Sequence, residues 1–192
     1  MSVFMEKDYR IINYIKNQLQ DYNPSFIDCV IKQFNLMVFK KEYGECLSYS
    51  IALYICAKEF GYNPKLCYGL CSYEDKCFYH AWLEIDDIII DNSIYADINY
   101  GVTSSIWENS INVPCIGKYE DMPIKYGKYV FDEDWIFSPL FPFEKMSFEK
   151  YISNTPQNAM WRLTCKMLGE FPTRKMINKL KLHIKDIYID RK

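Results

Sequence analysis

The stretch that decides the fold is residues 46–91, CLSYSIALYICAKEFGYNPKLCYGLCSYEDKCFYHAWLEIDDIIID. Its first part, residues 47–60, is apolar around most of a helical circumference, which predicts a buried central helix. Gly61 suits the position just after a helix end, and Pro64 prevents the helix from continuing. We therefore expect a helix that neighbouring elements cover on nearly all sides.

Beyond this helix the apolar residues follow the period of β-strands. Residues 65–72 and 77–85 alternate on either side of the polar stretch Tyr-Glu-Asp-Lys, which indicates a hairpin. Residues 88–91 form a third apolar run after a turn at 86–87. A buried helix followed by three antiparallel strands is typical of an α+β fold.

The segments before and after this core have weaker patterns. Residues 6–20 and 26–38 carry apolar stripes at helical spacing, and Ser25 is the expected cap of the second helix. Residues 92–126 are expected to be irregular, as a lid or rim, because a loop of that length is usually functional. Residues 126–132 are expected to add a fourth strand.

The C-terminal part is predicted to be helical over residues 144–153, 156–168 and 173–187. We interpret residues 1–140 as a catalytic core that includes the N-terminal helices. Residues 141–192 are interpreted as a C-terminal helical extension, in the same domain or beside it.

The composition fits a globular chain, since 49% of the 192 residues are hydrophobic. A net charge of −2 provides no global basic field, so no nucleic-acid partner is expected. The N-terminus shows no apolar signal region and no apolar run is long enough to span a membrane, which predicts a cytoplasmic location. The 8 cysteines are then expected to stay reduced, most of them as small buried residues.

The charges are unevenly distributed along the chain. Residues 71–134 are mainly acidic, and residues 144–192 are mainly basic. Solvated faces of a globular protein explain most runs of this kind. The functional interpretations are an acidic rim that favours a cationic substrate, and a basic C-terminal helix that binds a partner protein or another anionic surface.

Cys46 stands at the predicted start of the central helix, just after Gly44. There the positive end of the helix dipole and unpaired N–H groups stabilise a thiolate and can hold an oxyanion. His80, in the middle of the second predicted strand, is the candidate general base. The other histidine, His183, lies in the charged C-terminal helix, and we interpret it as a surface residue.

Asp91 ends the third predicted strand, which returns beside the strand of His80. A carboxylate there can fix the tautomer of the imidazole and stabilise the imidazolium. Asn92 or Asp97 would take this role if the strand register differed slightly. Cys46, His80 and Asp91 together have the chemistry of a nucleophile, a base and an orienting group.

Two short motifs make this chain resemble a known superfamily. Tyr43-Gly44-Glu45-Cys46 resembles the Tyr-Gly-Gln-Cys around the nucleophile of transglutaminases, with glutamate in place of glutamine. The run from His80 to Ile85, HAWLEI, is similar to the His-Ala-Trp-x-Glu strand of the bacterial transglutaminase-like superfamily. The short spacings from Cys46 to His80 and on to Asp91 resemble the compact branch that includes lasso-peptide leader peptidases.

The resemblance implies a papain-like fold in which a helix bearing Cys46 packs on an antiparallel sheet bearing His80 and Asp91. Cys46 is then the nucleophile, His80 the general base and acid, and Asp91 the orienting group, with no cofactor and no metal. The implied activity is amide hydrolysis or acyl transfer, through a thioester, on a peptide or protein substrate.

Three further residues are implied near the substrate or the oxyanion, namely Tyr43, Gly44 and Trp82, and Trp82 also suits the core beneath the histidine strand. Leu47 stands where transglutaminases place tryptophan, and no calcium-loop pattern is present. These departures favour a peptidase or a deamidase over a crosslinking enzyme.

Metal binding is a competing interpretation of the same region. Cys67, Cys71, Cys77 and His80 are residue types of a zinc site, although their spacing differs from the usual ligand pairs and they also suit a core. The acidic residues 86, 87 and 91 are a second candidate cluster, although adjacent aspartates are ordinary in a turn.

The aromatic residues and the class of function also allow more than one interpretation. A substrate groove or the core could contain Trp107, Tyr119, Tyr126, Tyr129 and Trp135. The chain could also be an inactive transglutaminase-like scaffold that binds proteins. An arylamine-type acyltransferase would share the same three residue types, but the surroundings of Cys46 differ from that family.

Overall fold

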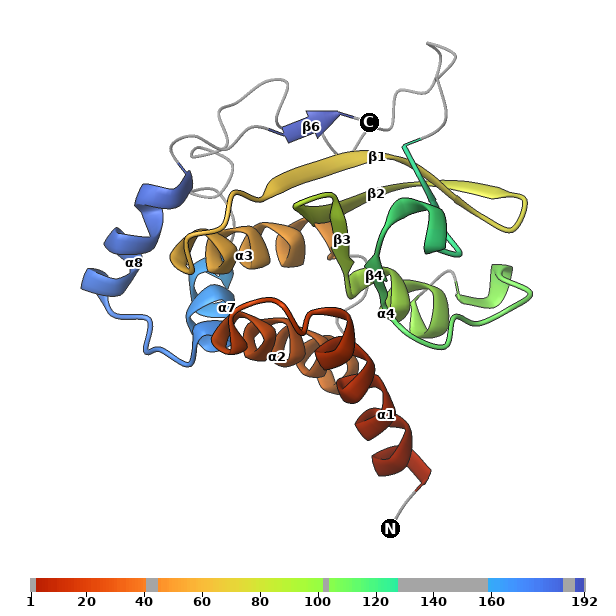
Figure 1. Ribbon diagram of the computed structural model, residues 1–192, viewed down its shortest axis with the longest axis horizontal. Helices are drawn as coiled ribbons and strands as arrows, with labels where there is room; N and C mark the ends of the chain where they lie inside the picture. Colours follow the sequence, from red (N-terminus) through yellow and green to blue (C-terminus); the bar gives the residue numbers. More distant parts are fainter. Residues whose placement is uncertain (1–2, 41–44, 102–103, 128–158, 185–188, 192) are drawn as a thin grey trace.

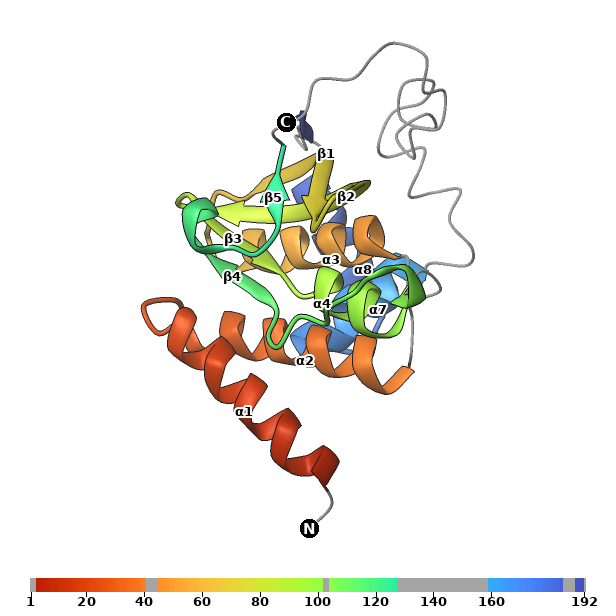
Figure 2. The same cartoon turned by 90° about the vertical axis from the view of Figure 1, so that its right-hand side faces the viewer.

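The sheet and three of the helices form successive layers. The computed structural model describes residues 3–40, 45–101, 104–127, 159–184 and 189–191. In two perpendicular views the sheet lies over α3 (Cys46–Glu59), and α2 (Pro24–Lys40) lies on the other side of α3 (Figures 1 and 2). Helix α7 (Ala159–Leu168) packs against both α2 and α3. This combination of helices with a mainly antiparallel sheet confirms the α+β class.

Helix α3 is central, as its apolar circumference predicted. All residues from Tyr49 to Ala57 are buried. At its C-terminus Gly61 adopts φ +82°, a left-handed conformation that favours glycine, and its N–H donates to Lys58 O. The predicted helix and its glycine terminus are both confirmed. The helix starts at Cys46, so the candidate nucleophile occupies its first position.

The three predicted strands form an antiparallel meander of β1 (Lys65–Tyr73), β2 (Lys76–Ile85) and β3 (Ile88–Asp91). Asp86 and Asp87 adopt φ values of 52° and 62°, which a tight two-residue hairpin turn requires. The register pairs Leu83 with Ile90. The end of β3, at Asp91, therefore returns beside the middle of β2.

Three short strands complete the sheet within the described residues. Strand β4 (Cys115–Gly117) is antiparallel to β3, and β5 (Lys125–Tyr126) is antiparallel to β1. Strand β6 (Ile189–Arg191) runs parallel to β1 and shares its outer edge with β5. The strand predicted over 126–132 coincides with β5 only at Tyr126, and residues 128–132 lie outside the described residues.

The prediction of an irregular segment over 92–126 is wrong. The segment contains α4 (Ser93–Tyr100), two strands, and the short turns η1 (Ser104–Ile106) and η2 (Tyr119–Asp121). Helix α4 buries Ile94, Tyr95 and Ile98. It has 8 residues, too few for a clear helical period, so burial and the capping described below determine it.

The N-terminal helices α1 (Val3–Gln18) and α2 agree with the predicted segments, but the predicted cap is wrong. Asn23, rather than Ser25, caps α2, because the Ser25 N–H donates to Asn23 Oδ1 at 2.9 Å. Pro24 then takes the first helical position, where its fixed φ and missing N–H are tolerated.

Helices α1 and α2 have 16 and 17 residues. No helix in the described part of the chain is long and apolar enough to cross a membrane.

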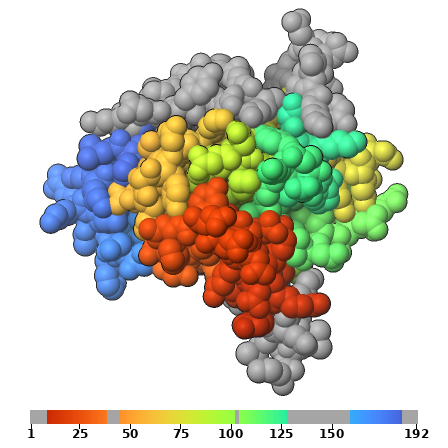
Figure 3. All heavy atoms as spheres, in the orientation of Figure 1, coloured from red at the N-terminus to blue at the C-terminus, as the bar shows by residue number. Residues whose placement is uncertain are grey.

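The C-terminal part shares the core of the preceding residues. Met160, Trp161 and Cys165 of α7 are buried in the same apolar cluster as α3. Helix α8 (Arg174–Leu180) follows and continues as a 3-10 turn, η4 (Lys181–Ile184), and Figure 3 shows this segment at one end of the molecule. The helix predicted over 173–187 is thus α-helical to Leu180 and a 3-10 turn to Ile184, and residues 185–187 lie outside the described residues. The helix predicted over 144–153, the start of the one at 156–168, and the boundary near residue 140 lie outside the described residues.

Candidate active site

Cys46 is the first residue of α3 and is partly exposed. The first N–H groups of a helix have no acceptor within the helix, and the dipole there favours a negative charge. The preceding residue, Glu45, forms no side-chain cap, although its Oε2 accepts the Ser48 hydroxyl at 2.9 Å. The sulfur therefore lies at the end of α3 where backbone N–H groups have no acceptor within the helix.

His80 is almost completely buried, with 2% of its surface exposed. Its Nε2 lies 2.7 Å from Asp91 Oδ2. Burial lowers the pKa of His80, but the charges of Asp91 and Cys46 and hydrogen bonds to both side chains outweigh it and raise the pKa well above the ordinary value. Because Nε2 faces Asp91, Nδ1 is the ring nitrogen left for a second partner.

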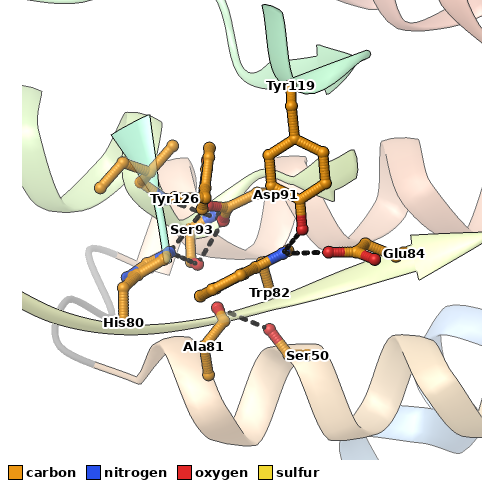
Figure 4. A network of polar contacts seen from close by, with 10 residues as sticks. Ser50, His80, Ala81, Trp82, Glu84, Asp91, Ser93, Tyr119 and Tyr126 are labelled. Carbon is orange, nitrogen blue, oxygen red and sulfur yellow. Dashed lines mark hydrogen bonds and ion pairs between the residues drawn. The ribbon is translucent and has the colours of Figure 1, made fainter. Parts of the chain in front are cut away.

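Asp91 is held by donors on both of its oxygens (Figure 4). Its Oδ1 accepts from the N–H of Ser93 at 3.0 Å, from the N–H of Ile94 at 3.2 Å and from the Ser93 hydroxyl at 2.7 Å. The carboxylate thereby caps the start of α4. Its Oδ2 accepts the Tyr126 hydroxyl at 2.8 Å in addition to His80.

These donors keep the carboxylate ionised in a buried place. Burial raises the pKa of Asp91, but the charge of His80 and the hydrogen bonds from His80, Ser93 and Tyr126 lower it below the ordinary value. A carboxylate fixed on both oxygens can orient the imidazole and balance its positive charge.

The two residues that could have replaced Asp91 do not contact His80 through any described hydrogen bond. Asn92 faces α2 instead, and its Nδ2 donates to Val30 O and to Gln33 Oε1, both at 2.9 Å. Asp97 lies further along α4 and is partly buried. Of Asp91, Asn92 and Asp97, it is Asp91 whose carboxylate is within hydrogen-bonding distance of the His80 imidazole.

Gln33 is a supporting residue that the sequence did not indicate. It is 2% exposed, and its Nε2 donates to Tyr49 O, in the first turn and a half of α3, at 2.7 Å. Its Oε1 accepts from Asn92, the residue after Asp91. One amide thus links the helix of Cys46 to the segment of Asp91. The sequence signal that could have indicated this role is the presence of a glutamine within the apolar helical stripe of residues 26–38.

Trp82 lies in the core next to this network. It is fully buried, and its Nε1 donates to Glu84 Oε1 at 3.0 Å and to the Tyr119 hydroxyl at 3.4 Å (Figure 4). Its ring centroid is 4.8 Å from that of Tyr126. With no exposed surface, Trp82 supports the site from below and has no surface for direct contact with a substrate. Tyr43 and Gly44 lie outside the described residues.

The remaining aromatic candidates have different positions. Tyr126 is buried on Asp91, whereas Trp107 packs edge-on against Phe78 with centroids 5.4 Å apart. Tyr129 and Trp135 lie outside the described residues.

The metal-binding interpretations have no support in the described residues. Among them no group of three or more histidine, cysteine, aspartate or glutamate side chains could hold a metal ion. Cys67 and Cys71 are buried, whereas Cys77 is exposed, and all eight cysteines are free. Burial raises the pKa of Cys71 and of Cys115, both near the site, to about 12, so these two thiols stay protonated.

His183 is more than a surface residue. It is partly buried, and its Nε2 contacts the Glu59 carboxylate at the end of α3, which also contacts Lys179. Burial raises the pKa of Glu59, but the hydrogen bonds and charges of Lys179 and His183 lower it. This cluster attaches the C-terminal helices to α3, away from the start of α3 where Cys46 lies.

Comparison with known proteins gives one result for this region. A family model described as the transglutaminase-like superfamily matches residues 31–105. The match runs from α2 to just beyond α4 and includes Cys46, His80 and Asp91. No significant match was found among curated proteins or solved structures. Residues 31–105 are therefore similar to the transglutaminase-like superfamily, and this region contains the three candidate residues.

Proposed function

We propose that this chain is a transglutaminase-like acyl-transfer enzyme in which Cys46 is the nucleophile, His80 the general base and acid, and Asp91 the orienting group. The observation that carries the proposal is the position of His80. It is buried with the carboxylate of Asp91 at 2.7 Å, and Cys46, at the start of α3, is among the groups that raise its pKa. The match over residues 31–105 supports the same assignment.

The first half of the reaction forms a thioester. His80 Nδ1 holds the proton of Cys46, and the Sγ attacks the amide carbonyl, so that the oxygen becomes an oxyanion. We assign the backbone N–H of Cys46, at the helix start, as one donor to this oxyanion. The C–N bond then breaks, and the amine leaves with the proton from His80.

The second half returns the enzyme to its starting state. His80 takes a proton from water, the resulting hydroxide attacks the thioester carbon, and the C–S bond breaks. The products are a carboxylic acid and the Cys46 thiol, with the proton again shared with His80. An amine in place of water gives a new amide by the same steps.

Hydrolysis of a peptide or of a protein side-chain amide is the reaction that we favour. Leu47 and the absence of a calcium-loop pattern in the sequence argue against a calcium-dependent crosslinking enzyme. The short spacing between His80 and Asp91 also fits the compact peptidases that the motifs resemble.

The test is acylation of the full chain by p-nitrophenyl acetate, an activated ester that needs no substrate recognition. Attack by Cys46 forms the Sγ–C bond and releases p-nitrophenolate, so we expect a burst of colour and an acetyl group mapped to Cys46 by mass spectrometry. The Cys46→Ser variant removes the burst, and the Cys77→Ser variant, at an exposed thiol, retains it. An acetyl group found first on Cys77 would overturn the proposal.

A further inference from the structure

Two tyrosines on neighbouring strands stack next to the candidate nucleophile. Tyr68 lies on β1 and is paired with Ala81 of β2, and Tyr79 lies two residues before Ala81. The rings are 5.7 Å apart between centroids and only 11° from parallel. Stacking of this kind adds to the burial of the rings and fixes their orientation.

This stack belongs to a small apolar cluster that is separate from the main core. The cluster consists of Tyr68 and Ala81, and Cys46, Leu47 and Tyr79 pack against it. Cys46 and Tyr79 therefore pack against the same two residues. Tyr68 is 4% exposed and forms the base, whereas Tyr79 and Cys46 are both partly exposed. A group bound to Cys46 thus has an aromatic ring within reach.

We infer that Tyr79, supported by Tyr68, binds the side chain on the acyl side of the substrate, and that this side chain is apolar and preferably aromatic. The inference rests on the proposed function, because it concerns the acyl group that Cys46 receives. A flat, partly exposed ring whose position is fixed by a second ring is suited to another apolar or aromatic group.

Charge next to Cys46 restricts the same substrate. Glu45 precedes Cys46 and is exposed, and its only described partner is the neutral hydroxyl of Ser48. A negatively charged acyl group would meet this carboxylate at short range, where like charges repel. We therefore expect donors with an aromatic acyl side chain to acylate Cys46 faster than donors with a small one. Donors with an acidic side chain should be the slowest.

The experiment compares p-nitrophenyl esters of N-acetylphenylalanine, N-acetylalanine and N-acetylglutamate on the full chain. Each acylation rate is divided by the rate of the same ester with free cysteine, which removes differences in intrinsic reactivity. Acylation of Cys46 is confirmed by mass spectrometry for each donor. We expect the phenylalanine donor to exceed the alanine donor by about tenfold, and the glutamate donor to be slowest.

Substitutions then test whether the stacked rings of Tyr68 and Tyr79 cause the preference for the phenylalanine donor. In Tyr79→Ala the advantage of the phenylalanine donor falls to about threefold or less. Tyr79→Phe keeps the ring and retains the advantage, so a loss in Tyr79→Ala is not a loss of the phenol hydroxyl. Tyr9→Ala, at a 66% exposed tyrosine of α1, is the matched control and leaves the order unchanged.

The outcomes separate the inference from the function on which it rests. If Cys46 is acylated but the donors react equally, or if Tyr79→Ala retains the full preference, the inference is wrong and the proposed function stands. If no donor acylates Cys46, the proposed function fails and the inference fails with it. Alkylation of Cys46 by iodoacetamide at the wild-type rate shows that Tyr79→Ala leaves the nucleophile intact.

Discussion

Asp91 Oδ2 lies 2.7 Å from His80 Nε2, and both residues are only 2% exposed. A carboxylate and an imidazole excluded from water are costly to bury singly, and here each compensates the charge of the other. Four more donors, two from Ser93 and one each from Ile94 and Tyr126, hold the carboxylate in place. Removing one partner therefore leaves the other poorly placed and uncompensated.

The substitution Asp91→Asn tests the role of this carboxylate. It keeps the size of the side chain but removes the charge that raises the pKa of His80. We expect acylation of Cys46 by p-nitrophenyl acetate to slow by roughly 10²- to 10⁴-fold, because the imidazole loses its orienting charge. The matched control is Asp87→Asn, at a turn carboxylate that is 91% exposed. Equal rates in the two variants would remove Asp91 from the mechanism.

The raised pKa of His80 predicts how stability depends on pH. A group whose pKa is higher in the folded state contributes stability fully below its unfolded pKa, about 6.5, and loses it as the pH rises through the folded value. We compare the free energy of unfolding of the wild type with that of His80→Gln, by urea at several pH values. The difference should be largest between about pH 5 and 6 and should shrink at alkaline pH. A difference that grows with pH would contradict the assignment.

The hydroxyl of Tyr126, on the edge strand β5, donates a hydrogen bond that lowers the pKa of Asp91. Tyr126→Phe removes its hydrogen bond to Oδ2 and keeps the ring packed against Trp82. Hydrogen bonds to a charged group are the stronger kind, so we expect the acylation rate of Cys46 to fall about tenfold. Tyr14→Phe removes a hydroxyl that donates to Ile116 O elsewhere and serves as the control. The prediction fails if both variants acylate at the wild-type rate.

Gln33 is expected to matter for stability and for the joint position of Cys46 and Asp91. Gln33→Leu removes the hydrogen bonds to Tyr49 O and from Asn92 Nδ2, each of which contributes about 0.5–1.5 kcal/mol to stability. Urea unfolding measures the loss. Gln20→Leu, at an exposed glutamine, should change the free energy of unfolding little. If Gln33→Leu and Gln20→Leu had the same free energy of unfolding, the hydrogen bonds of Gln33 would not contribute to stability.

The parts of the fold that could be predicted are those with strong local patterns. The apolar circumference of α3 and the period-two runs of β1 and β2 depend on residues close in sequence, so their signal is complete within a short window. The paired aspartates 86 and 87 similarly indicated the tight turn that returns β3 to β2. This turn is why His80 and Asp91 could be placed together from sequence.

The parts that could not be predicted depend on distant partners. Strand β6 has three residues and exists because it pairs with β1, more than a hundred residues earlier. Helix α4 is short and begins where Asp91 caps it, so the same carboxylate serves the fold and the site. The contact of Tyr126 with Asp91 spans 35 residues, and that of Gln33 with Asn92 spans 59. The hydrophobic periodicity of a short stretch of sequence does not predict contacts between residues this far apart.

The most direct test of the central claim is the order in which the eight cysteines react with a limiting amount of iodoacetamide at about pH 6, well below the ordinary thiol pKa of about 8.5. Mass spectrometry identifies the alkylated site. We predict that the partly exposed Cys46 reacts before the exposed Cys77, and that His80→Ala abolishes this order. Cys77 reacting first in the wild type, or an unchanged order in His80→Ala, would contradict the thiol–imidazole–carboxylate assignment.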